Sequence, residues 1–188
     1  MTLLAIGLAL FLGIHLVPVA APLRARVVAN WGEQRYKGLF SLVSFAGLAL
    51  IIAGYYFGER GPRLFAPLPA ARAVAPEAMA LTFVLLAAAN MRGHIRRVLK
   101  HPMLIGVLIW SSVHLLANGD LRGTILFGAF LAYAVIDLIS AIARGAVKTF
   151  VPIARHDVIA VVAGVLLAIV VMAVHRWLFG VRVVPFGF

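Results

Sequence analysis

The sequence contains no cysteine among its 188 residues. This absence excludes disulfide bonds, thiolate-ligated haem, iron–sulfur clusters and cysteine-based zinc sites. Acidic residues are also scarce, with six Asp and Glu against 17 Lys and Arg. A carboxylate-rich di-iron site is therefore excluded, and any metal must be held by histidine, carboxylate or methionine.

Charged residues of both signs make up only 12% of the chain, whereas 64% is hydrophobic and the mean hydropathy is +1.06. Such a composition is typical of a polytopic membrane protein. An apolar helix of about 20 residues spans the roughly 30 Å hydrocarbon core of a bilayer. Six apolar runs approach or exceed that length and leave no room for a soluble domain: 2–21, 37–57, 76–92, 102–119, 123–143 and 156–179. We therefore predict one all-α domain over 1–188, a transmembrane bundle of about six helices.

The basic residues are unevenly distributed among the connections between these runs. Three connections, 24–37, 92–100 and 144–155, hold 11 of the 17 Lys and Arg residues. Basic loops stay in the cytoplasm, so both termini are expected on the outer side of a bacterial inner membrane. The bilayer is the expected partner, and nucleic acid is not, because no basic face carries interleaved aromatic residues. The longest connection, 58–75, contains three prolines and is expected to be an irregular loop.

Two histidines lie inside the apolar runs, His15 in the first and His114 in the fourth. An ionisable side chain within a bilayer is costly and usually faces the bundle interior, so both are candidate functional residues. At about 1.5 Å per residue, both lie within roughly 5 Å of the midplane, on opposite sides of it. Two imidazoles at similar depth suit a haem, whose iron offers two axial positions, better than a zinc site, which needs four ligands. These residues alone leave three interpretations open: a haem site, histidines that only connect helices, and a site for another metal.

His101 differs from these two because it directly precedes Pro102 and so stands at the start of the fourth run. It is about 13 residues, or roughly 20 Å, from His114 along one helix, and the two cannot bind the same ion. Three further histidines near the ends of runs are expected to be solvated interfacial residues: His94, His156 and His175.

Two polar ridges and several small residues predict contacts between helices. Trp110, Ser111 and Asn118 share a helix face with His114, and hydrogen bonds to other helices are expected there. Asp137 is the acid that lies well inside a run, and it forms a polar ridge with Tyr133 and Ser140. An inter-helix Asp–His or Asp–Arg pair is expected there. The alternative is that Asp137 acts in a proton relay or contacts a substrate. Small residues would let neighbouring helices approach closely: Gly7, Gly13, Ser41, Ser44, Gly47 and Gly54.

Several motifs together resemble the NnrU family of bacterial membrane proteins. They are Gly13-Ile14-His15, the stretch from Trp31 to Ser44, Lys100-His101-Pro102-Met103-Leu104-Ile105-Gly106 with Trp110, and His114-Leu115-Leu116-Ala117-Asn118-Gly119-Asp120. The resemblance extends over essentially the whole chain. The family takes its name from genes associated with denitrification and nitric-oxide metabolism, so the resemblance implies a link to nitrogen-oxide chemistry.

The same pattern is similar to the 15-cis-zeta-carotene isomerases, which share this core. That resemblance implies haem b as cofactor, His15 and His114 as its axial metal ligands, and a structural or cofactor-edge role for His101. It also implies cis–trans isomerisation of a lipophilic polyene without net oxidation. The fifth run departs from the isomerases, because Tyr133 and Asp137 stand where they have further histidines.

Our interpretation is therefore a haem-binding membrane protein with a redox or isomerase-type role, acting on a polyene or a small gaseous nitrogen oxide. The alternative is a non-catalytic sensor of haem or nitric oxide, or an assembly factor. A weaker alternative follows from Lys100-His101-Pro102 and Gly106, which resemble a motif of isoprenylcysteine-type membrane methyltransferases that helps bind S-adenosylmethionine. Those enzymes need an acidic helix near the carboxyl end, and residues 175–180 contain no acid.

Overall fold

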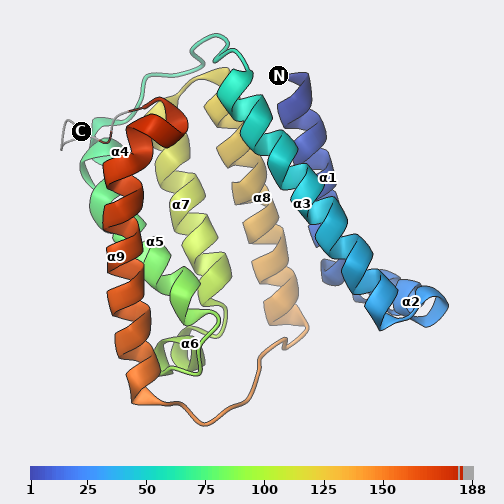
Figure 1. Cartoon of the computed structure of the whole chain (residues 1–188). Coiled ribbons are helices and arrows are strands. Elements are labelled where there is room, and N and C mark those ends of the chain that lie inside the picture. The colour runs from blue at the N-terminus through green and yellow to red at the C-terminus, as the bar shows by residue number, and fades with distance from the viewer. Residues whose placement is uncertain (182, 184–188) are drawn as a thin grey trace.

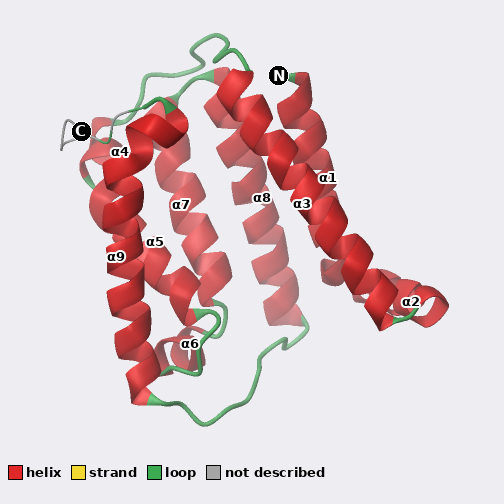
Figure 2. Ribbon diagram, viewed as in Figure 1, coloured by secondary structure: helices red, strands yellow, loops and turns green. Residues whose placement is uncertain are grey.

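The computed structural model describes residues 1–181 and 183, and within them the fold is helical, without a strand (Figures 1 and 2). Six helices correspond to the six apolar runs: α1 (Thr2–Val19), α3 (Glu33–Phe57), α5 (Ala75–Ala88), α7 (Pro102–Asn118), α8 (Leu121–Ala143) and α9 (Ala154–Phe179). Three short helices lie in the connections: α2 (Ala21–Trp31), α4 (Pro69–Ala73) and α6 (His94–Leu99). The predicted all-α fold is confirmed.

Four of these helices, α1, α3, α8 and α9, are long and apolar enough to cross a membrane. The other two are apolar but shorter, with 14 residues in α5 and 17 in α7. Their lengths of about 21 and 26 Å fall below the roughly 30 Å of a hydrocarbon core. Large apolar side chains cover the outside of the bundle, including Phe45 at 72% exposure and Phe57 at 79%. Such a surface suits contact with lipid rather than water.

The long helices follow one another in a row rather than in chain order. α3 packs on α1, α1 on α8, α8 on α7, α7 on α5, and α5 on α9. Figure 1 shows this row from the side, with the N-terminus and the end of α9 at the same end of the bundle. The largest buried cluster joins α1, α3 and α8 through Leu4, Leu8, Ile51, Leu126 and Phe127. The central position of α8 between α1 and α7 determines where the predicted histidines meet.

The connection 24–37 is largely helical, and the connection 58–75, predicted as an irregular loop, is ordered. Residues 24–37 contain most of α2 and the start of α3, and Pro22 stands in the first turn of α2, where its missing N–H costs nothing. The connection 58–75 is held by backbone hydrogen bonds, from Leu64 N to Gly119 O (2.8 Å) and from Leu121 N to Pro62 O (3.0 Å). The prolines therefore shape a fixed segment that lies over the turn between α7 and α8.

Small residues bring α1 and α3 into close backbone contact. A Cβ atom added to Gly7 would lie 2.6 Å from the Ile51 nitrogen, and one on Gly54 would lie 2.7 Å from Leu4 Cα. Gly47 makes a similar approach to α1. The predicted role of these three glycines at the α1–α3 interface is confirmed. Gly13, predicted with them, faces open space, because no atom lies within 4 Å of the position of its Cβ.

Candidate functional site

His15 on α1 and His114 on α7 both face α8, the helix between them. The His15 ring lies 6.1 Å from the Tyr133 ring, and the His114 ring lies 4.9 Å from the Phe127 ring. Phe127 and Tyr133 are six residues apart on α8, which corresponds to about 9 Å along its axis. The two histidines therefore differ in depth by a similar amount, in agreement with the placement expected from the sequence.

Each of these histidines is oriented by its own helix. His15 Nδ1 lies 2.6 Å from the Phe11 carbonyl oxygen, and His114 Nδ1 lies 2.9 Å from the Trp110 carbonyl oxygen. A carbonyl oxygen only accepts, so in both rings Nδ1 carries the proton and donates. In a neutral imidazole, Nε2 then keeps its lone pair. This tautomer, with Nδ1 held by a backbone carbonyl, is the one that an Nε2 metal ligand requires.

A continuous series of aromatic rings separates the two imidazoles. Between ring centres, Phe11 lies 4.2 Å from His15 and 5.8 Å from Phe130. The Phe130 ring centre lies 5.3 Å from that of Trp110, which in turn lies 5.5 Å from that of His114. Metal–imidazole bonds of about 2 Å would place two axial nitrogens about 4 Å apart. The structure therefore places His15 and His114 on the two helices that flank α8, without bringing their rings face to face. We call the rings of Phe11, His15, Trp110, His114, Phe127, Phe130 and Tyr133 the aromatic seam.

The polar residues near His114 bond within α7. The fully buried Ser111 hydroxyl donates to Val107 O at 2.7 Å, and the Asn118 amide donates to His114 O at 2.6 Å. The inter-helix hydrogen bonds predicted for Ser111 and Asn118 are wrong. Short polar side chains in apolar surroundings satisfy themselves on the nearest carbonyl one turn away, so they need no partner helix.

Asp137 pairs with Arg144, which caps the C-terminus of the same helix, so the predicted inter-helix pair is wrong. The Tyr133 hydroxyl donates to Asp137 Oδ2 at 3.0 Å, and Arg144 Nη2 lies 3.8 Å from Asp137 Oδ1. Arg144 also donates to the Pro18 carbonyl at 2.8 Å. The Ser140 hydroxyl donates to Val19 O at 3.4 Å. Arg144 and Ser140 therefore link α8 to the end of α1, and the Asp137 carboxylate does not.

His101 lies at the start of α7, away from the aromatic seam. It lines a cavity of about 170 Å³ together with Arg96, Lys100 and Lys148. The structure thus separates His101 from His15 and His114, as the position of Pro102 led us to expect. Within residues 1–181 and 183, no three His, Asp or Glu side chains gather closely enough to hold a metal ion.

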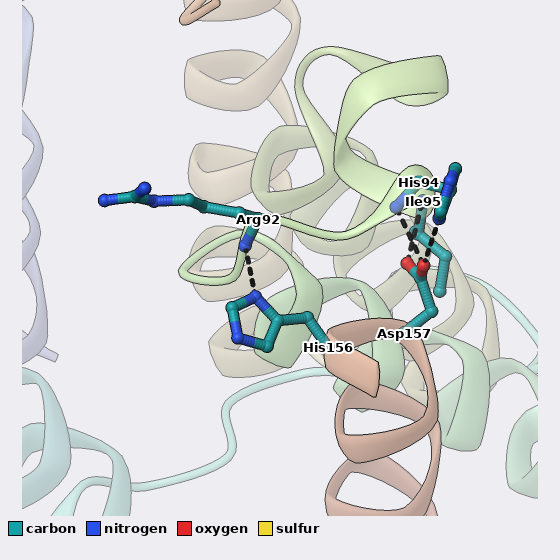
Figure 3. Close-up of polar contacts among 5 residues, drawn as sticks. All are labelled: Arg92, His94, Ile95, His156 and Asp157. Carbon is teal, nitrogen blue, oxygen red and sulfur yellow. Dashed lines mark hydrogen bonds and ion pairs between the residues drawn. The ribbon is translucent and has the colours of Figure 1, made fainter. Parts of the chain in front are cut away.

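A polar cluster that the sequence did not reveal joins α6 to α9 (Figure 3). Asp157, in the first turn of α9, accepts hydrogen bonds from the backbone nitrogens of His94 (2.8 Å) and Ile95 (2.9 Å). The His94 ring nitrogen Nδ1 lies 2.8 Å from the same carboxylate, and His156 Nδ1 accepts from Arg92 N at 3.1 Å. His94 and His156, two of the three histidines expected to be solvated, are thus hydrogen-bonded. The third, His175, is hydrogen-bonded to Val181 O at 2.8 Å. Asp157 caps the N-terminus of a helix distant in sequence, which local capping rules cannot predict.

Replacing Asp157 by alanine is expected to release α6 from α9 without unfolding the bundle. The variant leaves the first N–H groups of α6 without acceptors, so their amide hydrogens should exchange several-fold faster. Hydrogen-exchange mass spectrometry of residues 93–99 in detergent measures this. Asp157→Asn keeps one acceptor oxygen, so its exchange rate should lie between those of the wild type and the alanine variant. An unchanged exchange rate in the alanine variant would contradict the capping role.

Comparison with known proteins gives one match. The sequence model of the family described as NnrU protein matches residues 3–183 of the chain. No curated protein and no solved structure matches. The matched region includes all the helices that the structure describes, apart from Thr2 at the start of α1, and all the residues of the aromatic seam.

Proposed function

The chain belongs to the NnrU family, and from that premise we propose that it is a multi-pass protein of the bacterial inner membrane that binds one haem b at the aromatic seam. His15 on α1 and His114 on α7 would supply one axial imidazole each. The shorter helices α5 and α7 would complete a set of six spans. The basic connections around α2, α6 and 144–153 would face the cytoplasm, which leaves the N-terminus outside.

One observation carries this proposal, namely that both intramembrane imidazoles have Nδ1 bonded to a carbonyl of their own helix. Each Nε2 lone pair then points away from its helix backbone, in an interior lined by flat rings. Aromatic side chains pack well against the faces and edges of a conjugated macrocycle. The donor chemistry therefore fits an axially ligated haem.

The packing of the aromatic seam also shows which side chain would have to move for haem to bind. Phe130 contacts both Phe11 and Trp110, so its ring would have to leave the space between His15 and His114. The helices α1 and α8 would have to separate as well. Bound haem would supply a redox-active iron with two axial positions. His15 and His114 would hold and orient it, and the surrounding apolar helices would exclude water.

The proposed role is a redox or isomerase-type reaction on a small nitrogen oxide or on a lipophilic polyene. Support for it comes from the motifs shared with the carotene isomerases and from the apolar, ring-lined character of the seam. A second candidate is a non-catalytic sensor or assembly factor. The close packing of Phe11, Phe130 and Trp110 favours this second role, because it gives the seam a structural function without a ligand.

Titration of the detergent-purified chain with haemin tests the proposal. We expect a Soret absorbance that saturates near one haemin per chain, with the α and β bands of a low-spin b-type haem after reduction. The His15→Ala variant should bind haemin with a high-spin spectrum, since one axial position is lost. A linear rise in absorbance without saturation, identical in both proteins, would contradict haem binding.

Nitric oxide and a cis-polyene then distinguish the two roles. A catalytic protein should convert the polyene or consume nitric oxide over many turnovers. A sensor should show a stoichiometric spectral change with nitric oxide and no product.

A further inference from the structure

A cavity of about 260 Å³ lies at the end of the bundle where the N-terminus is found, far from the basic connections. Four arginines contribute to its walls: Arg60, Arg63, Arg72 and Arg122. The last residues of α3 and α7 and the first residues of α8 surround it, with Tyr55 and Asn118 among the lining side chains. It is thus a basic cavity at the level where apolar helices end.

Arg122 is the buried member of this group, with 6% of its surface exposed. Its Nη1 donates to the carbonyl oxygens of Tyr55 (2.5 Å) and Gly58 (2.8 Å), and its guanidinium lies 4.2 Å from the Tyr55 ring centre. Its Nε is buried and has no hydrogen-bond partner. A buried guanidinium with an unused donor is costly unless an anion compensates it.

The charge of the cavity is not balanced by the protein groups around it. Asp120 is the one acid that lines it, and its Oδ1 already accepts a hydrogen bond from Gly123 N at 2.7 Å. Across the residues that the structure describes, no guanidinium nitrogen of the four arginines lies within 4.0 Å of a carboxylate oxygen. Four guanidinium groups against one carboxylate leave the cavity strongly positive.

Backbone contacts fix the arginines in place before any ligand arrives. Arg122 N donates to Arg60 O at 3.1 Å, and Arg63 pairs with Asp120 through a backbone bridge. Arg72 Nε donates to the Ala117 carbonyl at 3.0 Å. The side chains of Arg60, Arg63 and Arg72 are exposed at the rim, while Arg122 forms the floor.

We propose that this cavity binds a phosphate group. Several guanidinium groups around one small space match the geometry of phosphate oxygens, which accept paired N–H donors. The cavity lies at the ends of helices long enough to cross a membrane, where lipid headgroups are found. The phosphate can therefore belong to an anionic lipid headgroup or to a soluble phosphate compound, and the two sources share the same recognition chemistry. This site is separate from the aromatic seam and does not depend on haem.

Native mass spectrometry of the whole chain in neutral detergent tests this assignment. The probes are phosphatidylglycerol, zwitterionic phosphatidylcholine and inorganic phosphate. The Arg60→Gln/Arg63→Gln variant removes two exposed rim charges without touching the backbone bonds. The matched control, Arg35→Gln/Arg97→Gln, removes two exposed charges at the opposite end of the bundle.

The wild type should bind phosphatidylglycerol or inorganic phosphate more tightly than phosphatidylcholine, and the rim variant should bind at least about tenfold more weakly, since each lost charge-assisted bond is worth roughly a factor of ten. The control should bind like the wild type. If inorganic phosphate does not displace bound phosphatidylglycerol, the ligand of the cavity is a lipid headgroup. If inorganic phosphate displaces it, the ligand is a soluble phosphate compound. Equal affinity in the wild type and the rim variant, an equal loss in the control, or no preference over phosphatidylcholine would overturn the proposal.

Discussion

Replacing His114 by alanine should abolish the low-spin Soret spectrum of the haem-loaded protein. We propose His114 as the iron ligand from α7, and in the described chain its ring lies 4.9 Å from the Phe127 ring of α8. Loss of an axial nitrogen leaves the iron with a weak or missing sixth ligand, which gives a high-spin spectrum or no binding. Absorption and electron paramagnetic resonance spectra of the purified variant measure this directly.

The His175→Ala variant is the matched control, because it distinguishes the loss of an iron ligand from a general loss of stability. His175, near the end of α9, bonds to the Val181 carbonyl at 2.8 Å and lies outside the aromatic seam. The His175→Ala variant should retain the complete spectrum. If His114→Ala also kept the full low-spin band, His114 would not be an axial ligand and the proposed site would be wrong.

Replacing Gly54 by alanine should destabilise the bundle by roughly 1–3 kcal/mol, the usual cost of overpacking a close contact. The new methyl group would lie 2.7 Å from Leu4 Cα, and a backbone atom cannot rotate away as a flexible side chain does. α1 and α3 must therefore separate, which disturbs the cluster of Leu4, Leu8 and Ile51. The thermal unfolding midpoint in detergent, followed by circular dichroism, should fall by several degrees.

Gly13→Ala is the matched control for this prediction. Gly13 lies on the same helix pair, but its added methyl group meets no atom within 4 Å. Since alanine favours the helix interior over glycine by roughly 0.5–1 kcal/mol, the control should be neutral or slightly more stable. Equal destabilisation by the two substitutions would show that close packing at Gly54 is not the cause.

The helical segments could be predicted from the sequence because hydropathy alone marks long apolar runs. Segment lengths were less predictable. The run 76–92 is longer than its helix α5, which ends at Ala88. The apolar composition continues into the turn that follows, so hydropathy does not mark the end of the helix. The glycines show the same limit. Gly7 and Gly13 look equivalent in the sequence, but six residues along a helix point in different directions, and only the packing of α1 on α3 selects Gly7.

Gly164 on α9 illustrates a contact that the sequence did not reveal. Its position leaves room for Val84 of α5, whose Cα would lie 2.5 Å from an added Cβ atom. No neighbouring glycine marks this site, and the partner helix is 80 residues away in the chain. The identity of a neighbour depends on the order of helices in the row, which short-range patterns do not encode.

The surroundings of the candidate site could not be predicted in detail. Positions within the runs placed His15 and His114 on opposite sides of the midplane, and the ring contacts with α8 put them about 9 Å apart along that helix. The rings between them could not be predicted, because Phe11, Phe130 and Trp110 come from three helices whose order is set by long-range packing. Arg122 likewise lies outside the predicted runs, directly before the run 123–143, yet it is buried against the end of α3.

The haem content of the protein purified from its membrane tests the central claim most directly. Oxidised and dithionite-reduced absorption spectra, with a pyridine haemochrome assay for stoichiometry, give both the haem type and the number per chain. The account predicts a b-type spectrum with about one haem per chain, in keeping with one pair of axial histidines. A colourless protein that yields no haem and takes up no added haemin would contradict it and leave the aromatic seam as helix packing.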